Sequence, residues 1–272
     1  MSAPVSWPAF IHTAPETGHV VQVYDELDEL SRSLARYVDA GLRTGAPAIV
    51  IATHDHWERF TRDLKAREWD PGSLEEQGLL TYMDAEETLA AVMDLELPSS
   101  ERFADVVGRV VDGVATRFPD RTIRAFGEMV DLLWQRGRED AAIALEGLWN
   151  ELQLRRRFAL LCGYHLDIFD IRVQAEALPR VFRAHTHAQP VEDNSRLAAA
   201  LDQALAEIVG PAEAARIYLD VAERVPRGSL PRAQAVLGWL STSGNLNAAR
   251  VLERTRMHYL RMRRASTLAF AP

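Results

Sequence analysis

The sequence contains almost no cysteine and almost no lysine. Cys162 is the only cysteine among 272 residues, so a disulfide within the chain is excluded and a reducing compartment is favoured. Without a Cys-x-x-Cys pair, the usual thiolate zinc site is excluded as well. Lysine occurs once, as Lys65, although Lys and Arg together number 31. Because Lys65 lies in a charged helical stretch, we expect it to be solvated rather than to form a Schiff base.

A phosphate-binding loop of the Walker type is also missing. Such a loop needs glycine followed by lysine and Ser/Thr, so that backbone N–H groups and the lysine reach the phosphates. Here the strand-like run Ala48–Ala52 leads into Thr53, His54, Asp55 and His56, with neither glycine nor lysine in the turn. A Walker ATPase is therefore excluded.

Long apolar runs are absent too. No stretch reaches the roughly 18 to 20 apolar residues that span a bilayer, and the N-terminus lacks the basic start and apolar core of a signal peptide. We therefore expect a soluble, cytoplasmic protein with no membrane partner. The formal net charge of -8 disfavours binding of nucleic acid by the whole surface.

The charge is unevenly distributed along the chain. Residues 230–264 contain seven arginines and a single acid, Glu253. Such a stretch forms either a surface for nucleic acid or another anionic partner, or an arginine-rich helix that folds back onto an acidic body. Both interpretations stay open at the level of sequence.

Strand-like and helical patterns alternate through the first part of the chain. Strands separated by helices of this length pair in parallel through right-handed crossovers. The pattern therefore predicts an α/β fold, a doubly wound and mainly parallel sheet flanked by helices. The expected strands are residues 48–52, 78–83, 121–126 and 158–164.

The pattern changes after a polar segment at residues 189–194. From there on every periodic segment is helical, and the chain ends in the arginine-rich stretch. We expect an α/β domain over residues 1–188 and a small all-α region over residues 195–272.

Ligands of such sheets gather beyond the carboxyl ends of the strands. The turn after the first expected strand allows two interpretations. Its His54, Asp55 and His56 would form a ligand- or proton-sensing cluster, because histidine titrates near neutral pH, or Asp55 would cap the next helix while both histidines stay in solvent. The other polar residues expected at this edge are Asp84, Glu128, Tyr164 and His165.

Buried polar pairs are also expected around the sheet. In "RAFGEM" the carboxylate of Glu128 emerges at the ligand edge, and Arg124 would be its partner if it is buried. Glu146 and Asn150 stand four residues apart and share one helix face, as ligand contacts or as a hydrogen-bonded pair to the sheet. A ligand role and a structural role stay open for both pairs.

The sequence predicts neither a metal site nor a cofactor. Cys162 and His165 offer two metal-compatible atoms, which do not close a site. His185 and His187 lie far along the chain, where we expect a solvated helix end. Cys162 itself stands in an apolar strand and is expected to be inert core.

Four separated motifs, in order, resemble the MEDS sensory domain over roughly residues 18–170. They are "GHVVQVYDELDELSRSLARYVDAGLRTGAPAIVIAT", "IRAFGEMVDLLW", "LEGLWNEL" and "LLCGYHLDIF". This domain occurs in bacterial and archaeal regulators of one-carbon metabolism, beside histidine kinase modules and alone, and is regarded as a relative of the KaiC/RecA-like fold without its Walker loop. The family commonly has aspartate where this chain has His165. The matching positions are His19 at the first helix, Gly41, Gly127–Met129, Glu146, Asn150, Cys162, Tyr164 and Phe169.

The tail "AVLGWLSTSGNLNAARVLERTRMHYLRMRR" is loosely similar to a Fis-type helix-turn-helix. This similarity implies contacts with DNA, largely with its phosphates. The competing interpretation is a dimerisation or docking helix. The residues that would face DNA are Arg250, Arg254, Arg256, His258, Arg261 and Arg263.

We therefore expect a non-catalytic bacterial signalling or transcription-regulatory protein. Its partners would be a small molecule or a regulatory protein such as a histidine kinase or response regulator, with DNA or a second copy of the chain at the tail. The alternatives are an atypical nucleotide hydrolase or phosphotransfer protein that uses Glu128, and a purely scaffolding homodimer. The expected ligand-binding residues are His19, His54, Asp55, His56, Arg124, Glu128, Glu146, Asn150, Tyr164 and His165.

Overall fold

The computed structural model describes residues 7–15, 18–224 and 230–269, which fall into two compact units. The α/β unit comprises the described residues up to His165 together with Ala184–His187. The helical unit comprises residues 166–183 and those from 188 onward. The expected domain division between residues 188 and 195 stays a prediction, and its outer bounds, 1 and 272, lie outside the described residues.

The α/β unit is built around a six-stranded sheet with the order β3-β2-β6-β7-β1-β8. The pairs β1–β7, β7–β6, β6–β2 and β2–β3 are all parallel. The predicted parallel α/β fold, flanked by helices and followed by a helical region, is therefore confirmed. The strands are β1 (His19–Tyr24), β2 (Ala48–Ala52), β3 (Leu80–Asp84), β6 (Ile123–Gly127), β7 (Phe158–His165) and β8 (His187–Gln189).

One prediction about the start of the fold is wrong, because His19 begins a strand and not a helix. All six residues of β1 are buried, so the sequence shows no alternation of apolar and polar residues there. The valines at 20, 21 and 23 favour an extended conformation, since β-branched side chains fit a pleated surface.

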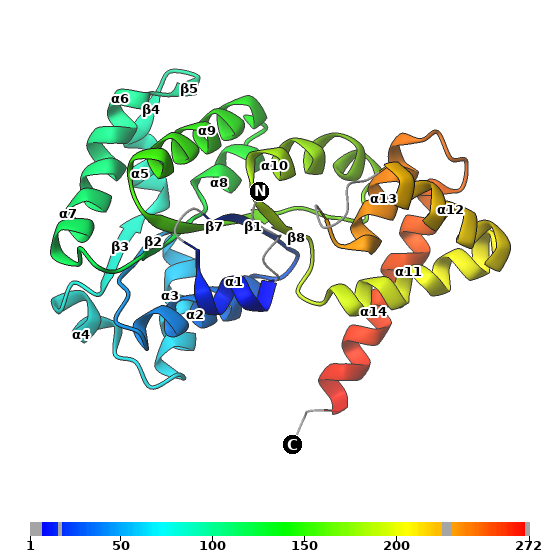
Figure 1. The fold of residues 1–272 in the computed structure, drawn as a ribbon, viewed down its shortest axis with the longest axis horizontal. Coiled ribbons are helices and arrows are strands. Elements are labelled where there is room, and N and C mark those ends of the chain that lie inside the picture. The colour runs from blue at the N-terminus through cyan, green and yellow to red at the C-terminus, as the bar shows by residue number, and fades with distance from the viewer. Residues whose placement is uncertain (1–6, 16–17, 225–229, 270–272) are drawn as a thin grey trace. The chain divides into compact units, whose positions relative to one another are not determined.

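Helices cover both faces of the sheet (Figure 1). Helices α1 (Trp7–Thr13), α2 (Leu27–Leu42) and α3 (His54–Lys65) lie on one face and share a core with β1 and β2. Helices α5 (Ala85–Val92), α8 (Met129–Gln135) and α9 (Glu139–Arg155) cover the other face. The remaining elements of this unit are α4 (Pro71–Glu76), β4 (Met93–Asp94), β5 (Leu97–Pro98), α6 (Ser100–Phe103), the π-helix η1 (Ala104–Gly108) and α7 (Arg109–Arg117).

The helical unit packs α11 (Asn194–Ile208) against α14 (Ala248–Ala269). Leucines at 197, 201 and 205 recur every four residues and are fully buried, which is the apolar stripe of an amphipathic helix. Asp193 begins α11 as its N-cap and accepts from the backbone N–H of Arg196 at 2.9 Å. The other elements are the π-helix η2 (Val173–Ala177), α10 (Leu178–Ala184), α12 (Gly210–Arg224) and α13 (Arg232–Thr242).

The helices were also compared with the requirements of a membrane span. Within the described parts of the chain, none is long and apolar enough to cross a bilayer.

Candidate functional site

A pocket of about 460 Å³ lies at the carboxyl ends of β1, β2, β6 and β7. This is the edge at which parallel α/β sheets bind ligands, and the volume falls within the range of small-molecule sites. We call it the strand-end pocket. Its lining residues are Tyr24, Asp25, Glu26, Leu27, Asp28, Thr53, His56, Arg59, Glu128, Asp131, Leu132 and His165.

Glu128 anchors this pocket from the end of β6. Its side chain is 2% exposed and accepts from the backbone N–H of Thr53, the N-cap of α3, and from Nδ1 of His56. A helix N-terminus attracts anions because its first N–H groups have no partner within the helix. The turn after β2 thus holds a carboxylate of the chain itself where a nucleotide loop would hold phosphate.

The charge of Glu128 acts on its histidine partner. Burial by itself would lower the pKa of His56, but the hydrogen bond and the negative charge of Glu128 raise the pKa above its usual value. The internal carboxylate of Glu128 therefore favours the protonated form of His56.

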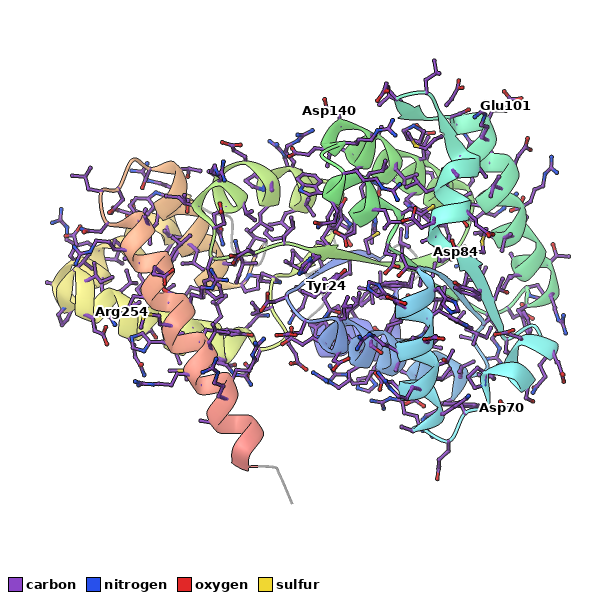
Figure 2. All side chains as sticks on the ribbon, turned by 180° about the vertical axis from the view of Figure 1, so that it is seen from behind. Tyr24, Asp70, Asp84, Glu101, Asp140 and Arg254 are labelled. Atoms are coloured by element: carbon purple, nitrogen blue, oxygen red, sulfur yellow. The ribbon has the colours of Figure 1, made fainter. Side chains whose placement is uncertain are left out.

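Asp131 forms the adjacent wall of the pocket. It accepts from Tyr24 Oη at 3.0 Å, from the backbone N–H of His165 at 3.0 Å and from Gln135 Nε2 at 3.1 Å. Burial raises the pKa of the Asp131 carboxyl, although these hydrogen bonds oppose the rise. Tyr24 lies between the sheet and α2 (Figure 2), and its ring stacks on that of His165 with centroids 5.3 Å apart. Asp131 is not among the residues predicted from the sequence, although its position three residues after Glu128 indicates that the two side chains lie close together.

The lining of the pocket is predominantly acidic. Five carboxylates face Arg59, His56 and His165, and Arg59 is itself paired with Asp28 at 2.7 Å. Such a lining favours a cation or a hydrogen-bond donor and repels phosphate.

Of the three polar residues in the turn after β2, only His56 reaches the pocket. His54 is exposed and its Nε2 lies 3.3 Å from Glu58 in the next turn of α3. Asp55 is exposed in the first turn, and the N-cap is Thr53, so the expected cap by Asp55 is wrong. Asp84 does cap its helix, since it accepts from the backbone N–H of Glu87 at 2.9 Å.

The expected pair of Arg124 with Glu128 is also wrong. Arg124 donates to the carbonyl oxygens of Ile11 at 2.5 Å, Tyr37 at 2.7 Å and His12 at 2.8 Å. Arg124 lies near the start of β6 and Glu128 directly after its end, four positions or roughly 13 Å of extended chain apart, so they serve opposite ends of the sheet.

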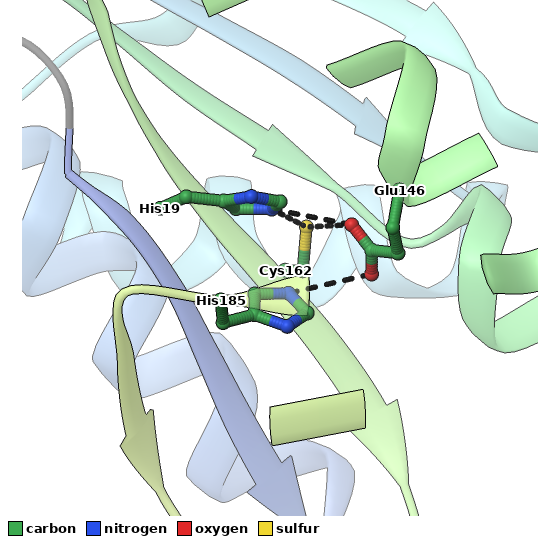
Figure 3. Close-up of side chains that lie close together, drawn as sticks. All are labelled: His19, Glu146, Cys162 and His185. Carbon is green, nitrogen blue, oxygen red and sulfur yellow. Dashed lines mark hydrogen bonds and ion pairs between the residues drawn. The ribbon is translucent and has the colours of Figure 1, made fainter. Parts of the chain in front are cut away.

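A second group of polar side chains lies buried on the α9 face of the sheet (Figure 3). His19 comes from β1, Glu146 from α9, Cys162 from β7, and His185 from the short segment before β8. One ligand-type atom from each lies within 4.8 Å of all the others. We call these four residues the buried cluster.

Two polar neighbours fix the orientation of the buried cluster. Asn150 Nδ2 donates to the carbonyl oxygen of Ala184 at 3.1 Å, so its Oδ1 faces His19 Nδ1 at 3.0 Å. Tyr164 Oη donates to Glu146 Oε1 at 2.9 Å. Glu146 and Asn150 thus both contact His19, as expected for residues on one helix face, and whether they have a ligand role or a structural role stays open.

Burial and mutual charge shift the pKa values within the buried cluster. Burial, with the neighbouring His185, lowers the pKa of His19. Burial by itself would raise the pKa of Glu146, but the two histidines hold that pKa well below its usual range. Burial also raises the pKa of the Cys162 thiol.

The prediction of a solvated helix end at His185 is wrong. Its side chain is 0% exposed and its Nε2 lies 3.3 Å from Glu146 Oε1. Nothing in the local sequence signals this burial, because the residue meets the sheet only when the chain returns to the α/β unit at Ala184–His187.

The residues expected to contact DNA lie on α14, in the helical unit. Arg254 and His258 both pair with Glu207 of α11, at 3.0 and 3.1 Å, and Arg256 pairs with Asp167 at 3.2 Å. Figure 2 labels Arg254 on this helix. These pairs favour the interpretation of an arginine-rich helix folded onto acidic neighbours. Arg250 and Arg261 are exposed, and Arg263 is half-buried.

The sequence was compared with known protein families and curated proteins. The family model described as MEDS, MEthanogen/methylotroph, DcmR Sensory domain, matches residues 18–186, which is more than half of the chain. The match covers β1 to β7 and includes His185 of the buried cluster. No curated protein matches the chain.

Proposed function

The chain belongs to the MEDS family of sensory domains, and from that premise we propose that its α/β unit is a non-catalytic sensor that binds a small molecule in the strand-end pocket. A sensory domain serves signalling, and the pocket supplies a place of suitable volume at the expected edge of the sheet. The observation that carries the proposal is the predominantly acidic lining of this pocket.

The carboxylate of Glu128 at the N-terminus of α3 supports descent from a KaiC/RecA-like domain that no longer binds nucleotide. A phosphate at the turn after β2 would meet Glu128 and the other acids of the pocket instead of lysine and glycine. The same contacts disfavour a hydrolase, because a Glu128 carboxylate held by Thr53 and His56 is not free to activate water.

The chemistry of the lining defines the ligand class. Asp25 and Glu26 add negative charge at one side of the pocket, where Asp28 is paired with Arg59. A small organic cation, such as a protonated amine, suits this excess of negative charge. We therefore assign the pocket to a compact amine rather than to a nucleotide.

The output of the sensor is assigned to the helical unit. The ion pairs of Arg254 and Arg256 leave fewer arginines for phosphate contacts than the sequence of α14 implies. This favours docking to a regulatory protein, such as a histidine kinase, over a Fis-type contact with DNA.

Binding to the full-length protein tests the proposed ligand class. We expect alkylamines to raise the Tm of the wild type, whereas matched neutral alcohols and ATP do not. Glu128→Gln is expected to lose the response while retaining its circular dichroism spectrum. His54→Ala is the matched control, because His54 stands in the same turn but is exposed.

Two results would contradict the proposal. One is tight binding of ATP that depends on Glu128, which would restore the nucleotide hypothesis. The other is an amine response that survives Glu128→Gln unchanged, which would place the ligand elsewhere.

A further inference from the structure

We propose that the buried cluster is a binding site for one divalent transition-metal ion of the zinc class. The site is separate from the strand-end pocket. Side chains alternate between the two faces of a strand, so His19 of β1 faces α9, whereas Tyr24 of the same strand faces α2. Cys162 pairs in register with Val21 and shares the face of His19. The inference therefore goes beyond the proposed function.

Three of the distances within the cluster lie near the edge lengths of a metal-centred tetrahedron. Zinc bonds of about 2.0–2.1 Å to nitrogen or oxygen and about 2.3 Å to sulfur place tetrahedral ligand atoms about 3.3–3.6 Å apart. His19 Nε2 lies 3.2 Å from Glu146 Oε2 and 3.3 Å from Cys162 Sγ. His185 Nε2 lies 3.3 Å from Glu146 Oε1, and Cys162 Sγ lies 3.7 Å from Glu146 Oε2. His185 approaches the other oxygen of the carboxylate, and the four ligand atoms lie within 4.8 Å of one another, so binding of one ion requires His185 and Glu146 to move closer to the remaining ligands.

Hydrogen bonds alone account less well for this arrangement. The amide of Asn150 is oriented by its bond to the carbonyl oxygen of Ala184, so His19 Nδ1 donates to Asn150 Oδ1. In a neutral imidazole, Nε2 of His19 then carries a lone pair that faces the oxygen of Glu146 and the sulfur of Cys162. Its distance to the carboxylate, 3.2 Å, also exceeds the roughly 2.7–2.9 Å of a charge-assisted hydrogen bond. The single S–H of Cys162 can serve only one of these two acceptors, whereas a cation between the three atoms accepts a lone pair from each.

The surrounding contacts resemble the outer shell of a metal site. Metal-bound histidines usually donate their second ring N–H to a fixed acceptor, which sets the tautomer and the ring plane. Asn150 gives His19 that acceptor, and the hydroxyl of Tyr164 holds the carboxylate of Glu146 at 2.9 Å. Both neighbours therefore orient ligand atoms toward one point.

The ligand types select the metal. Two imidazole nitrogens, one thiolate sulfur and one carboxylate oxygen suit zinc and similar transition metals. Calcium and magnesium require shells made of oxygen, so a site with a sulfur ligand rejects them. On binding, the Cys162 thiol releases its proton to solvent and the metal–sulfur bond forms in its place.

A metal at this site would hold a returning segment of the chain against the sheet. His185 belongs to Ala184–His187, the short return of the chain to the α/β unit between two segments of the helical unit. Thr186 already ties this return to β1, because its backbone N–H donates to the carbonyl oxygen of His19 at 2.7 Å. A metal bound by His19 and His185 fixes the return segment against β1, β7 and α9.

Metal content of the full-length protein is the first test. The protein is stripped with a chelator, reloaded with Zn²⁺, passed through gel filtration and analysed by elemental mass spectrometry. We expect one equivalent of zinc per chain and a rise in Tm relative to the stripped protein. With Co²⁺ we expect the visible d–d bands of a tetrahedral ion and a thiolate-to-cobalt charge-transfer band in the near ultraviolet. A folded wild type that retains no zinc would overturn the proposal.

Substitutions locate the metal within the chain. Cys162→Ser is expected to lose the charge-transfer band, and His185→Ala to lose stoichiometric zinc. His187→Ala is the matched control, two residues away and outside the cluster, and is expected to keep one equivalent. Zinc retained by His185→Ala, or a cobalt spectrum without a sulfur band in the wild type, would place the metal elsewhere and refute the proposed site.

Discussion

At the scale of single residues, the strand-end pocket depends on a carboxylate that water hardly reaches. Glu128 accepts from Thr53 N–H and from His56, and these contacts replace the solvation that it loses on burial. Removing one partner of such a pair leaves the other buried without compensation. Substitution of either member is therefore expected to destabilise the folded protein.

Glu128→Gln is expected to lower the free energy of unfolding by about 1–3 kcal/mol, because the amide cannot satisfy both donors as a carboxylate does. Urea unfolding near neutral pH measures this loss. His54→Ala, at an exposed position of the same turn, is expected to change the free energy of unfolding by less than about 0.5 kcal/mol. Equal effects in the two variants would contradict the assigned role of Glu128.

The same pair predicts a pH dependence with a defined sign. The pKa of His56 is raised in the folded protein above the ordinary value of 6.5. Its contribution to stability is therefore fully present below about pH 6.5 and is lost as the pH rises through the raised pKa. In Glu128→Gln, burial dominates and lowers the pKa of His56, so the slope of this contribution should reverse. Urea unfolding at several pH values from roughly 5 to 9 measures this slope in the wild type, in Glu128→Gln and in His54→Ala.

At the scale of elements, α2 and β6 contact each other through Gly41 of α2 and Arg124 of β6. A Cβ atom at Gly41 would stand 2.6 Å from Nε of Arg124, closer than such atoms approach one another. Arg124 has little freedom to move, because three backbone carbonyl oxygens hold its guanidinium and its side chain is buried. The lack of a side chain at Gly41 therefore leaves space for the Arg124 side chain, at the end of the sheet opposite the pocket.

Gly41→Ala is accordingly expected to destabilise the protein by about 1–3 kcal/mol, although alanine is the better helix former. Gly147→Ala in α9 is the matched control. Apart from its chain neighbours and the backbone of its own helix, no atom of the described residues lies within 4 Å of a Cβ placed there, so the helix propensity of alanine should stabilise the protein by about 0.5–1 kcal/mol. Thermal unfolding of both variants measures whether each substitution lowers or raises the Tm. A stabilised Gly41→Ala would show that Arg124 is free to move aside.

At the scale of the whole molecule, the open question is what the helical unit contacts. Retention of the full-length chain on DNA fragments across a salt series tests the Fis-type resemblance of α14. Because Arg254 and Arg256 are engaged in ion pairs, we expect weak retention with a shallow dependence on salt. Steep, salt-sensitive retention that falls in the double variant Arg250→Ala/Arg261→Ala would instead establish DNA as the output. Dimerisation likewise stays a prediction.

Local sequence patterns were sufficient to predict the class of fold and the edge of the sheet that holds the pocket. Continuous apolar runs such as residues 48–52 and 158–164 encode strands buried on both faces, and the helices between them impose parallel pairing. Glu128 and His56 follow from this pattern, because each stands just after a strand. The absence of a Walker loop and the presence of the MEDS motifs could also be recognised from the sequence, because both are local patterns.

Which side chains meet depends on packing that no local pattern records. Arg124 bonds to backbone carbonyls rather than to Glu128, and no periodicity records where a carbonyl from α1 will lie. The partnership of His19 with His185 depends on the return of the chain to β1, far along the sequence. Local patterns report burial and secondary structure, because these depend on neighbours along the chain. The polar centre of a site depends on register and on the crossing of distant segments, which the packed fold alone sets.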